Sequence, residues 1–479
     1  MQRIQNYING TLQAPVSGSY MDNINPAIGE VYSHIPDSDD QDVELAVKAA
    51  QAAFPAWSTC GAQQRSEILL RISRLIHERL DELALAESVD NGKPLSLAKT
   101  VDIPRAAANF HFYGTAILHD ANESHYLELP AINYTMRRPI GVAGCISPWN
   151  LPLYLFTWKI APALASGNTV VAKPSEITPM TAYLLSEICI AAGLPAGVLN
   201  IVHGYGHKVG QAIIEHEQVP VISFTGGTVT GKKIAATAAP MFKKLSLELG
   251  GKNPNIIFAD CDFEEALNTA VRSSFANQGQ ICLCGSRILI ERSIYDKFRA
   301  AFVEKVSQLQ VGDPLTEVNL GAVVSKPHQE KVLAYIELAK EEGGTVLTGG
   351  KVVNPEGRCK NGYFIEPTVI EGLAQTCRTN QEEIFGPVVT LTPFDSEAEA
   401  IEMANSNAYG LAASIWTTNI TKAHRVAHGV HSGIIWVNCW MLRDLRTPFG
   451  GMKQSGMGRE GGFEALRFFT EEKNVCVKL

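Results

Sequence analysis

Residues 219–232 read VPVISFTGGTVTGK, a strand-like apolar run that passes through a glycine-rich turn into a helical stretch. Two further β-branched runs, at 169–172 and 198–202, are separated by helical stretches that end in glycine or proline. Such alternation is typical of parallel βαβ units. It predicts an α/β fold with a doubly wound, Rossmann-like sheet that binds a dinucleotide.

Other stretches of the chain give further structural predictions. A second alternating block after Lys252 has strand-like runs at 255–258 and 287–290, and we expect it to form a catalytic domain. Apolar residues at helical spacing over 62–88 predict one amphipathic helix that packs on a sheet. The most apolar stretch, 151–172, predicts buried helix and strand and not a membrane helix, because it is interrupted by Pro152, Lys159, Pro162 and Asn168.

The glycine-rich turn has the features of a phosphate site. Gly226, Gly227 and Gly231 follow a predicted strand and open a helix, so backbone N–H groups and the helix dipole can approach a phosphate. The pattern nearly matches a P-loop, but Lys233 stands where a serine or threonine would bind magnesium. It also differs from the usual GxGxxG spacing. On spacing alone, the glycines could equally serve close packing of the helix on the strand.

Composition limits the classes of partner. The chain has 479 residues, a net charge of -8, 46% hydrophobic residues and 19% charged residues, which is typical of a globule with a sizeable core. Its acidic balance argues against nucleic acid or membrane partners and favours small molecules. Its 10 cysteines are scattered without the spacing of a disulfide framework. With no export signal at the N-terminus, we expect reduced thiols and a cytoplasmic protein.

One cysteine lies in a setting suited to acyl chemistry. Cys282 ends the segment 275–282, FANQGQIC, while Glu248 precedes a glycine pair and Asn150 follows Pro-Trp. These residue types supply a thiol nucleophile, a carboxylate base and an amide donor. A thiol that attacks an aldehyde gives a thiohemiacetal, which becomes a thioester when an acceptor removes hydride, and water then releases an acid. Cys284 shows no zinc-site spacing, and we assign it no role.

These segments together resemble the aldehyde dehydrogenase superfamily over essentially the whole chain. The matching stretches are SPWNLP at 147–152, AKPSE at 172–176, FTGGT at 224–228, LELGGK at 247–252, the cysteine segment, EEIFGP at 382–387 and PFGG at 448–451. The resemblance implies that Cys282 is the nucleophile, Glu248 the general base and Asn150 the oxyanion donor.

The resemblance also implies a division of the chain. It assigns 1–118 and 139–250 to an NAD-binding domain, 251–447 to a catalytic domain, and 119–138 with 466–479 to a small β oligomerisation arm. The alternating residues 474–479 fit an edge strand of that arm. A homodimer or homotetramer is therefore expected.

The cofactor that the resemblance implies is NAD. The family's phosphate turn has the GxxxxG form, matched by Gly226 and Gly231, although many members have serine where this chain has Gly227. Glu176, with Lys173, lies where an adenosine ribose is expected, and a carboxylate there favours NAD over NADP. The alternative interpretation is that Lys173 and Glu176 form a solvent-exposed ion pair with no role in cofactor binding. The expected cofactor contacts are Ile146, Pro148, Trp149, Lys173, Ser175, Glu176, Phe224, Gly226, Gly227, Gly231, Leu249, Glu383 and Phe385.

The substrate side combines apolar and cationic residues. Leu151, Tyr154, Trp158 and Phe449 would suit an apolar tunnel. By family correspondence Arg443 replaces a tunnel aromatic and Arg105 lies beside the entrance, so a carboxylate on the substrate is expected. Surface ion pairs are the alternative for both arginines. With these two arginines, the chain most closely resembles the enzymes that oxidise 2-aminomuconic and 2-hydroxymuconic semialdehydes. Of the two substrates, we favour the amino compound.

The alternatives fall into separate classes. Lys159 and Glu460 resemble outer proton-relay positions, but each could be a surface charge. The acyl group could be transferred to coenzyme A instead of water, although Glu248 favours hydrolysis. A further enzymatic alternative is an aldehyde dehydrogenase that accepts a broader range of aldehydes. A crystallin-like structural protein is the non-enzymatic reading, and the intact set of Cys282, Glu248 and Asn150 argues against it.

Overall fold

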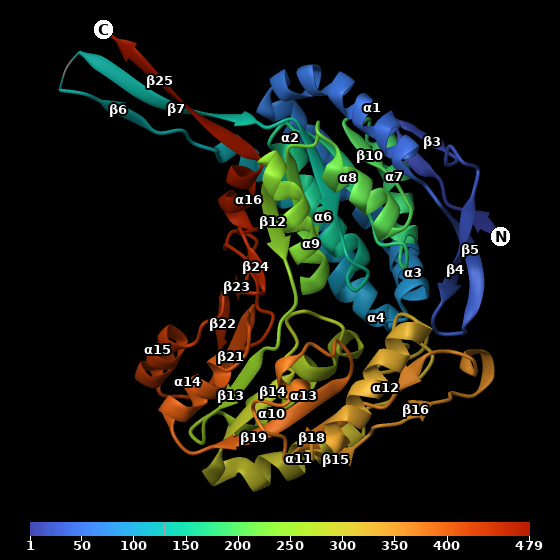
Figure 1. Ribbon diagram of the computed structural model, residues 1–479, viewed down its shortest axis with the longest axis vertical. Coiled ribbons are helices and arrows are strands. Elements are labelled where there is room, and N and C mark those ends of the chain that lie inside the picture. The colour runs from blue at the N-terminus through green and yellow to red at the C-terminus, as the bar shows by residue number, and fades with distance from the viewer. Residues whose placement is uncertain (129) are drawn as a thin grey trace.

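The computed structural model describes residues 1–128 and 130–479, which form an upper lobe, a lower lobe and a projecting arm (Figure 1). A mixed sheet lies at the centre of the upper lobe. Its strands run in the order β24 (Gly456–Met457), β12 (Lys244–Glu248), β11 (Val221–Thr225), β8 (Val142–Ile146), β9 (Thr169–Lys173), β10 (Leu199–Ile201), β2 (Asn6–Ile8) and β3 (Thr11–Gln13).

The central strands β8 to β12 are parallel, which confirms the predicted βαβ pattern. Chain order runs outward from β8 through β9 to β10 on one side, and from β11 to β12 on the other. The order therefore reverses between β8 and β11. Crevices at such a switch point, beyond the carboxyl ends of the strands, are where doubly wound sheets bind ligands.

Alternating side chains explain why both faces of this sheet are covered. Val142, Val171 and Ile222 pack on one face with α1 (Asp40–Thr59), α8 (Gln211–Glu215) and α9 (Thr228–Ala238). Their neighbours Ala143 and Val170 point to the opposite face, against α6 (Pro152–Ala165) and α7 (Met180–Ala191). Every residue of α6 is buried, as the apolar stretch 151–172 predicts.

The helix predicted over 62–88 is wrong in two respects. The segment forms two helices, α2 (Ala62–Glu78) and α3 (Leu80–Asn91), because Arg79 leaves the helical region with φ -101° and ψ 23°. The Arg79 guanidinium bonds both Glu82 and Glu187 at this break. The apolar face of α2 packs on α5 (Ile103–Ala116) and not on a sheet, because the fully buried α6 already occupies that layer.

A second mixed sheet forms the lower lobe. Its order is β15 (Thr345–Thr348), β18 (Thr368–Glu371), β19 (Val388–Phe394), β14 (Arg287–Glu291), β13 (Pro254–Ile257), β21 (Ala412–Trp416) and β22 (Ile434–Val437). The helices packed on it are α10 (Phe263–Phe275), α11 (Tyr295–Ser307), α12 (Lys326–Glu341), α14 (Glu397–Asn405) and α15 (Ile420–Gly429). The predicted strands at 255–258 and 287–290 correspond to β13 and β14.

Short elements complete the lobes. Small sheets pair β1 (Gln2–Arg3) with β5 (Glu30–Pro36) and β4 (Tyr20–Asn25), β16 (Val352–Val353) with β17 (Phe364–Ile365), and β20 (Tyr409–Gly410) with β23 (Met452–Lys453). The remaining short helices are α4 (Leu95–Leu97), α13 (Arg378–Gln381) and α16 (Gly462–Phe468).

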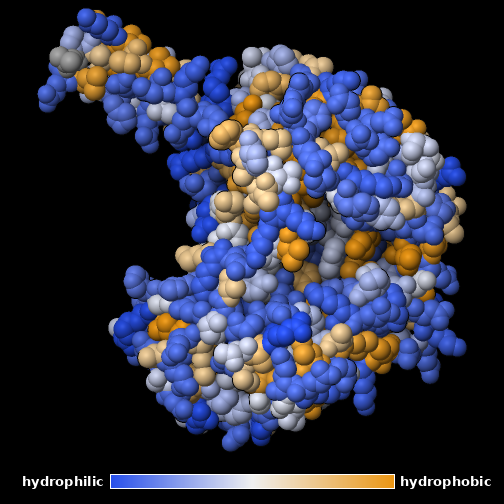
Figure 2. All heavy atoms as spheres, viewed as in Figure 1, coloured by the Kyte–Doolittle hydropathy of each residue, from blue (hydrophilic) through white to orange (hydrophobic). Residues whose placement is uncertain are grey.

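The arm is a sheet in the order β25 (Thr470–Lys478), β7 (Ala131–Pro139) and β6 (Ser124–Tyr126) (Figure 1). The strand expected over 474–479 is therefore present and begins earlier, at Thr470. Figure 2 shows hydrophobic residues along the arm on a face that is otherwise mostly hydrophilic. Leu127 and Leu479, at the end of the arm, are 48% and 67% exposed. The expected domain boundaries stay a prediction.

Within residues 1–128 and 130–479, no helix has both the length and the apolar character that crossing a bilayer requires.

Candidate active site

The strand register brings the expected cofactor residues to one edge of the upper sheet. Ile146, at the end of β8, lies opposite Lys173 of β9 and Phe224 of β11. Thr225, at the end of β11, lies opposite Glu248 of β12. Because parallel strands end at the same edge, residues far apart in sequence become neighbours there.

A cavity of about 260 Å³ opens beyond this edge. Of the residues predicted from sequence, it is lined by Pro148, Trp149, Asn150, Gly226, Gly227, Leu249, Cys282, Glu383 and Phe385. Ile146, Lys173, Ser175, Glu176, Phe224 and Gly231 are not among the lining residues. Gly231 packs under the lining residue Leu249, where a Cβ atom would come within 2.5 Å of the leucine side chain. Gly231 therefore serves close packing, whereas Gly227 has open space where its Cβ would be.

Cys282 is presented by a strained turn after α10. Asn277 and Gln278 both have left-handed backbones, with φ of 51° and 56°. Left-handed conformations are costly for residues other than glycine and occur preferentially at functional sites. Cys282 is partly exposed to the cavity, and its carbonyl accepts from Asn253 Nδ2 at 2.7 Å. Burial, with the Glu383 and Glu248 carboxylates nearby, raises the pKa of the Cys282 thiol.

Asn150 is buried beside the cysteine turn. Its side-chain Nδ2 donates to the Gln280 carbonyl at 3.0 Å, two residues before Cys282. This bond uses one of the two amide hydrogens. The amide is thus tethered next to the nucleophile and retains a hydrogen for a further acceptor.

Glu248 ends β12 and is only 3% exposed. Among the residues that the structure describes, neither of its carboxylate oxygens has a hydrogen-bond partner. Burial, and then the nearby Glu460 carboxylate, raise the pKa of Glu248 well above its ordinary value. A carboxylate in such a site is a stronger base than one in water.

Lys159 and Glu460 form a buried ion pair, not surface charges. Lys159 Nζ lies 2.7 Å from Glu460 Oε1 and 3.1 Å from Ser223 Oγ, and the Ser223 hydroxyl donates to Glu460 at 3.1 Å. Glu248 lies close enough for the charges of both to affect its pKa.

Lys173 and Glu176 pair at the end of β9. Lys173 Nζ is 2.8 Å from Glu176 Oε2, and the Gly206 N–H donates to Glu176 Oε1 at 3.2 Å. Burial acts to raise the pKa of Glu176, but the Lys173 ammonium outweighs it and leaves that pKa lowered. Ser175 is buried next to this pair, and its Oγ accepts from the Ile177 N–H at 3.2 Å.

Glu383 and Phe385 reach the cavity from the segment after α13. Glu383 Oε1 accepts from the Gly251 N–H at 2.9 Å, and a Cβ on Gly250 would come within 2.2 Å of Glu383 Oε2. The bare glycine pair therefore admits Glu383. Burial raises the pKa of Glu383 to about 6.

Sequence reasoning missed several residues that line this cavity. His328 and Lys331 reach it from α12, and Thr225 from the end of β11. The His328 ring lies 5.0 Å from the Trp149 ring, and its Nε2 is 2.7 Å from the Phe385 carbonyl oxygen. No local motif marks His328 or Lys331, because only the packing of α12 brings them here.

A narrow inner pocket lies on the other side of Cys282. It is lined by Leu151, Tyr154, Glu248, Cys282, Met441, Arg443, Phe449 and Glu460, among others. The Arg443 guanidinium lies 4.2 Å from the centre of the Phe449 ring and 5.2 Å from that of Trp158, and it bonds the Tyr154 hydroxyl at 2.6 Å. The predicted aromatic residues and Arg443 therefore form one wall.

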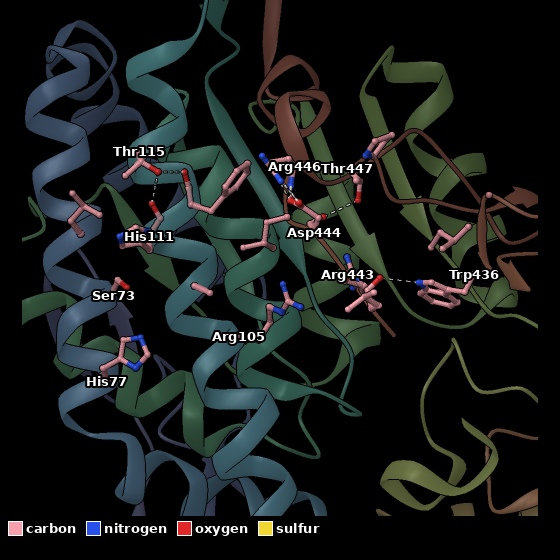
Figure 3. A pocket seen from close by; sticks show the side chains of 18 of the residues that line it. Ser73, His77, Arg105, His111, Thr115, Trp436, Arg443, Asp444, Arg446 and Thr447 are labelled. Carbon is pink, nitrogen blue, oxygen red and sulfur yellow. Dashed lines mark hydrogen bonds and ion pairs between the residues drawn. The ribbon is translucent and has the colours of Figure 1, made fainter. Parts of the chain in front are cut away.

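Outside this pocket lies a wide vestibule of about 1500 Å³ between α2, α5 and the segment 433–448 (Figure 3). Figure 3 shows Arg105 on α5 and Arg443 on the facing segment. Arg105 lies 5.7 Å from the centre of the Tyr154 ring, so both arginines contact the same tyrosine. The charged or titratable residues that line the vestibule are Arg74, His77, Arg105, His111, Arg443, Asp444 and Arg446.

Cys284 is buried two residues beyond the nucleophile. Its carbonyl, like that of Cys282, accepts from Asn253 Nδ2. Burial raises the pKa of its thiol to about 12. The thiol is therefore neutral and inert near pH 7.

Comparison with known proteins identifies relatives along the full chain. The 2-aminomuconic semialdehyde dehydrogenase of Bos taurus is 51% identical over 479 residues, covering 99% of this chain and 98% of its own. The 2-hydroxymuconic semialdehyde dehydrogenase of Pseudomonas sp. (strain CF600) is 49% identical and covers 100% of both chains.

Solved structures of known proteins have the same fold as this chain. The NAD+ complex of an aldehyde dehydrogenase from Bacillus cereus has a TM-score of 0.97 and 40% identity, covering 100% of this chain and 97% of that one. PnpE from Pseudomonas sp. WBC-3 has a TM-score of 0.97 and 42% identity, covering 100% and 98%. The profile of the aldehyde dehydrogenase family matches residues 13–475. The predicted fold class is confirmed, and the chain belongs to the aldehyde dehydrogenase family.

Proposed function

We propose that this protein oxidises an acidic semialdehyde, 2-aminomuconate 6-semialdehyde, to the carboxylic acid with NAD. The observation that carries the proposal is the pair of guanidinium groups, Arg443 and Arg105, on the aromatic wall that leads to Cys282. The names of the relatives support the same substrate class.

A carboxylate would pair with these arginines for physical reasons. Guanidinium groups form charge-assisted, often bidentate hydrogen bonds with carboxylates. Arg443 has two aromatic rings and a tyrosine hydroxyl as its contacts but no carboxylate ion pair within the described residues, whereas the exposed Arg446 is paired with Asp444. An incoming carboxylate would supply the anion that Arg443 lacks.

The covalent chemistry is assigned to Cys282, Asn150 and Glu248. The Cys282 thiol adds to the aldehyde carbon and forms a thiohemiacetal, whose oxygen accepts hydrogen bonds from Asn150 Nδ2 and the Cys282 N–H. Oxidation of this adduct leaves a thioester on Cys282, and water activated by Glu248 hydrolyses it to the acid and the free thiol.

The electrostatics support a base in this position. Burial keeps Cys282 in its thiol form, so its proton must leave as the sulfur attacks. Glu248 lines the inner pocket with Cys282, and burial raises its pKa, so it accepts a proton readily. We assign the outer proton relay to the buried Lys159–Ser223–Glu460 network, whose charges already act on Glu248.

The residues at this edge of the sheet suit a dinucleotide. The hydroxyl of Thr225, at the end of β11, is buried and lacks a hydrogen-bond partner among the described residues, and the space beside Gly227 is open. When bound, NAD accepts the hydride removed from the aldehyde carbon. The α9 N-terminus would hold its phosphates, with Glu383, Phe385, Pro148, Trp149 and Leu249 around the nicotinamide half and Lys173, Ser175 and Glu176 near the adenosine.

We assign NAD over NADP on the basis of Glu176. A carboxylate near the ribose accepts bonds from its hydroxyls and repels a 2′-phosphate. Titration of the protein with both dinucleotides tests this assignment. Wild type should bind NAD more tightly, and Glu176→Gln should weaken NAD and strengthen NADP binding; unchanged relative affinities would contradict it.

Two enzymatic alternatives remain distinct from this proposal. 2-Hydroxymuconic semialdehyde is the second candidate substrate, because a relative named for it covers the whole chain at 49% identity. Transfer of the acyl group to coenzyme A is disfavoured because Glu248 already lies in the pocket of the thioester. Product analysis with and without coenzyme A distinguishes transfer from hydrolysis.

The decisive experiment measures NADH absorbance with muconic semialdehydes generated in situ. A neutral aldehyde of similar length is the matched substrate. A much higher kcat/KM for the acids supports the proposal, and the ratio between the amino and hydroxy compounds selects the substrate. Equal kcat/KM for acidic and neutral aldehydes would refute the acidic-substrate assignment.

We also propose that the arm joins copies of the chain into a homodimer or homotetramer in the cytoplasm. The exposed Leu127 and Leu479 and the open edges of β6 and β25 support a role in association. Light scattering of the wild type and of a chain shortened before β25 tests the role of the arm.

A further inference from the structure

The backbone carbonyl of Asn150 receives an unusual number of buried donors. Lys93 Nζ donates to it at 3.1 Å and Asn277 Nδ2 at 2.9 Å. Asn91 Nδ2 lies 3.5 Å away and donates to the preceding Trp149 carbonyl at 2.9 Å. A carbonyl oxygen has two lone pairs, so this acceptor is saturated.

Lys93 is fully buried and is held by acids from two other segments. Its Nζ bonds the Asp102 carboxylate and lies 3.6 Å from Glu87 Oε1. Glu87, on α3, also accepts from the Leu153 N–H at 3.3 Å, at the start of α6. These side chains are 0% exposed, and the loss of one partner from such a buried ion pair is strongly destabilising because it leaves an uncompensated charge.

Asn277 connects the Asn150 peptide to the cysteine turn. Its Nδ2 also lies 3.2 Å from the Gln280 carbonyl, which is the acceptor of the Asn150 side chain. The bonds close a ring: the Asn150 amide and the Asn277 amide share the Gln280 oxygen, and the Asn277 amide also reaches the Asn150 oxygen. The left-handed backbone of Asn277 places its amide in this ring.

We infer that Lys93 and Asn277 are positioning residues for the oxyanion step. They fix the Asn150 peptide from both sides, so the side-chain amide stays aimed at the oxygen of a tetrahedral adduct on Cys282. The physical reason is preorganisation: a donor stabilises a developing oxyanion strongly only when it does not have to reorient during the reaction. This inference rests on the role proposed for Asn150.

The test compares two reactions of Cys282 that differ only in the oxyanion. Acylation by p-nitrophenyl acetate passes through a tetrahedral oxyanion, whereas alkylation by iodoacetamide does not. Both rates are followed at the peptide that contains Cys282 by mass spectrometry. Lys93→Met should slow acylation about 10- to 100-fold and leave alkylation within about twofold. Equal slowing of both reactions would mean general distortion and would overturn the inference.

The inference also requires that Lys93 act through Asn150. In an Asn150→Ala background, adding Lys93→Met should slow acylation no further, whereas multiplicative losses would overturn it. Lys243→Met is the matched control, because Lys243 is also buried and also donates to backbone carbonyls, those of Ile214 and His216. Its acylation rate should equal that of the wild type.

A second variant covers the case in which Lys93→Met does not fold. Asn277→Gly keeps the left-handed turn accessible and removes the amide. It should show the same split between acylation and alkylation, and a wild-type acylation rate would overturn the inference. Full acylation in Asn150→Ala would instead contradict the proposed role of Asn150 itself, so the two failures are distinguishable.

Discussion

The cavities on the two sides of Cys282 are lined by different kinds of group. On the cofactor side, strand ends and glycines leave Thr225, Gly226, Gly227 and Gly250 along the wall of a cavity. On the aldehyde side, α6 and a distant loop form an aromatic and cationic wall around Arg443. In the proposed function, backbone shape therefore contributes more to the cofactor side, whereas the substrate side depends on side-chain chemistry.

This difference separates the effects that substitutions should have. Changes at the shared centre should abolish turnover with every substrate. Changes on the aldehyde side should discriminate between aldehydes, and those on the cofactor side should alter dinucleotide affinity alone.

The largest loss of activity is expected from removal of the Cys282 sulfur, which lies between the cofactor side and the aldehyde side. Cys282→Ala removes the nucleophile, so oxidation should fall at least about 10³-fold while NAD binding, measured by fluorescence titration, persists. Cys284→Ala is the control, since its buried thiol has no assigned chemistry, and it should stay within a few-fold of wild type. Retained turnover in Cys282→Ala would exclude covalent catalysis by this residue.

Glu248→Gln should lower steady-state turnover by about 10²- to 10⁴-fold, because the thioester can no longer be hydrolysed efficiently. The base acts in its ionised form, and burial raises its pKa. Wild-type activity should therefore be lost as pH falls through this raised pKa and should increase above it, with a rising limb above the ordinary carboxylate range of about 4–5. A pH profile unchanged in the variant would assign that limb to another group.

Arg443→Met tests the aldehyde side alone. Loss of a charge-assisted hydrogen bond of about 1.5–3 kcal/mol should lower kcat/KM for the acidic semialdehyde roughly 10- to 100-fold. A neutral aldehyde should be oxidised as before. Arg446→Met, which removes an exposed arginine paired with Asp444, is the matched control and should change neither rate. Equal losses for both aldehydes would indicate a packing role for Arg443.

The smallest effect is expected on the cofactor side. Gly227→Ser adds a hydroxyl at the start of α9, where no heavy atom lies within 4 Å of the new Cβ. A hydrogen bond of about 0.5–1.5 kcal/mol to a phosphate should tighten NAD binding roughly 2- to 10-fold, measured by calorimetry. Weaker binding would show that the phosphates do not approach this position.

Much of the fold follows from local patterns. Strands β9, β11, β13 and β14 were predictable because buried parallel strands read as short apolar, β-branched runs. The break at Arg79 was not, because apolar spacing continues through it and one of the two partners of Arg79, Glu187, lies far away in sequence on another helix. Packing of α2 on α5 likewise depends on α6 already covering the sheet.

Some residues of the candidate site were likewise predictable from sequence, and others were not. Cys282, Glu248 and Asn150 lie in stretches whose residue types already suggest their chemistry. Lys93 and Asn277 donate to a backbone carbonyl, which any residue has, so the sequence around the acceptor does not reveal the contact. His328 reaches the cavity only through the packing of α12, and no local motif predicts it. Contacts between a side chain and a distant backbone atom are visible only after folding.

The single helix α6 carries Tyr154 and Trp158 of the substrate wall next to Lys159 of the buried ion pair, and it is packed on every side. Engineering of new specificity on this helix would therefore disturb the proposed proton relay and the sheet together. The loop around Arg443 tolerates change better, since the adjacent Leu442 is 78% exposed. A mutant library aimed at other aldehydes should diversify residues 441–446 and leave the helix untouched.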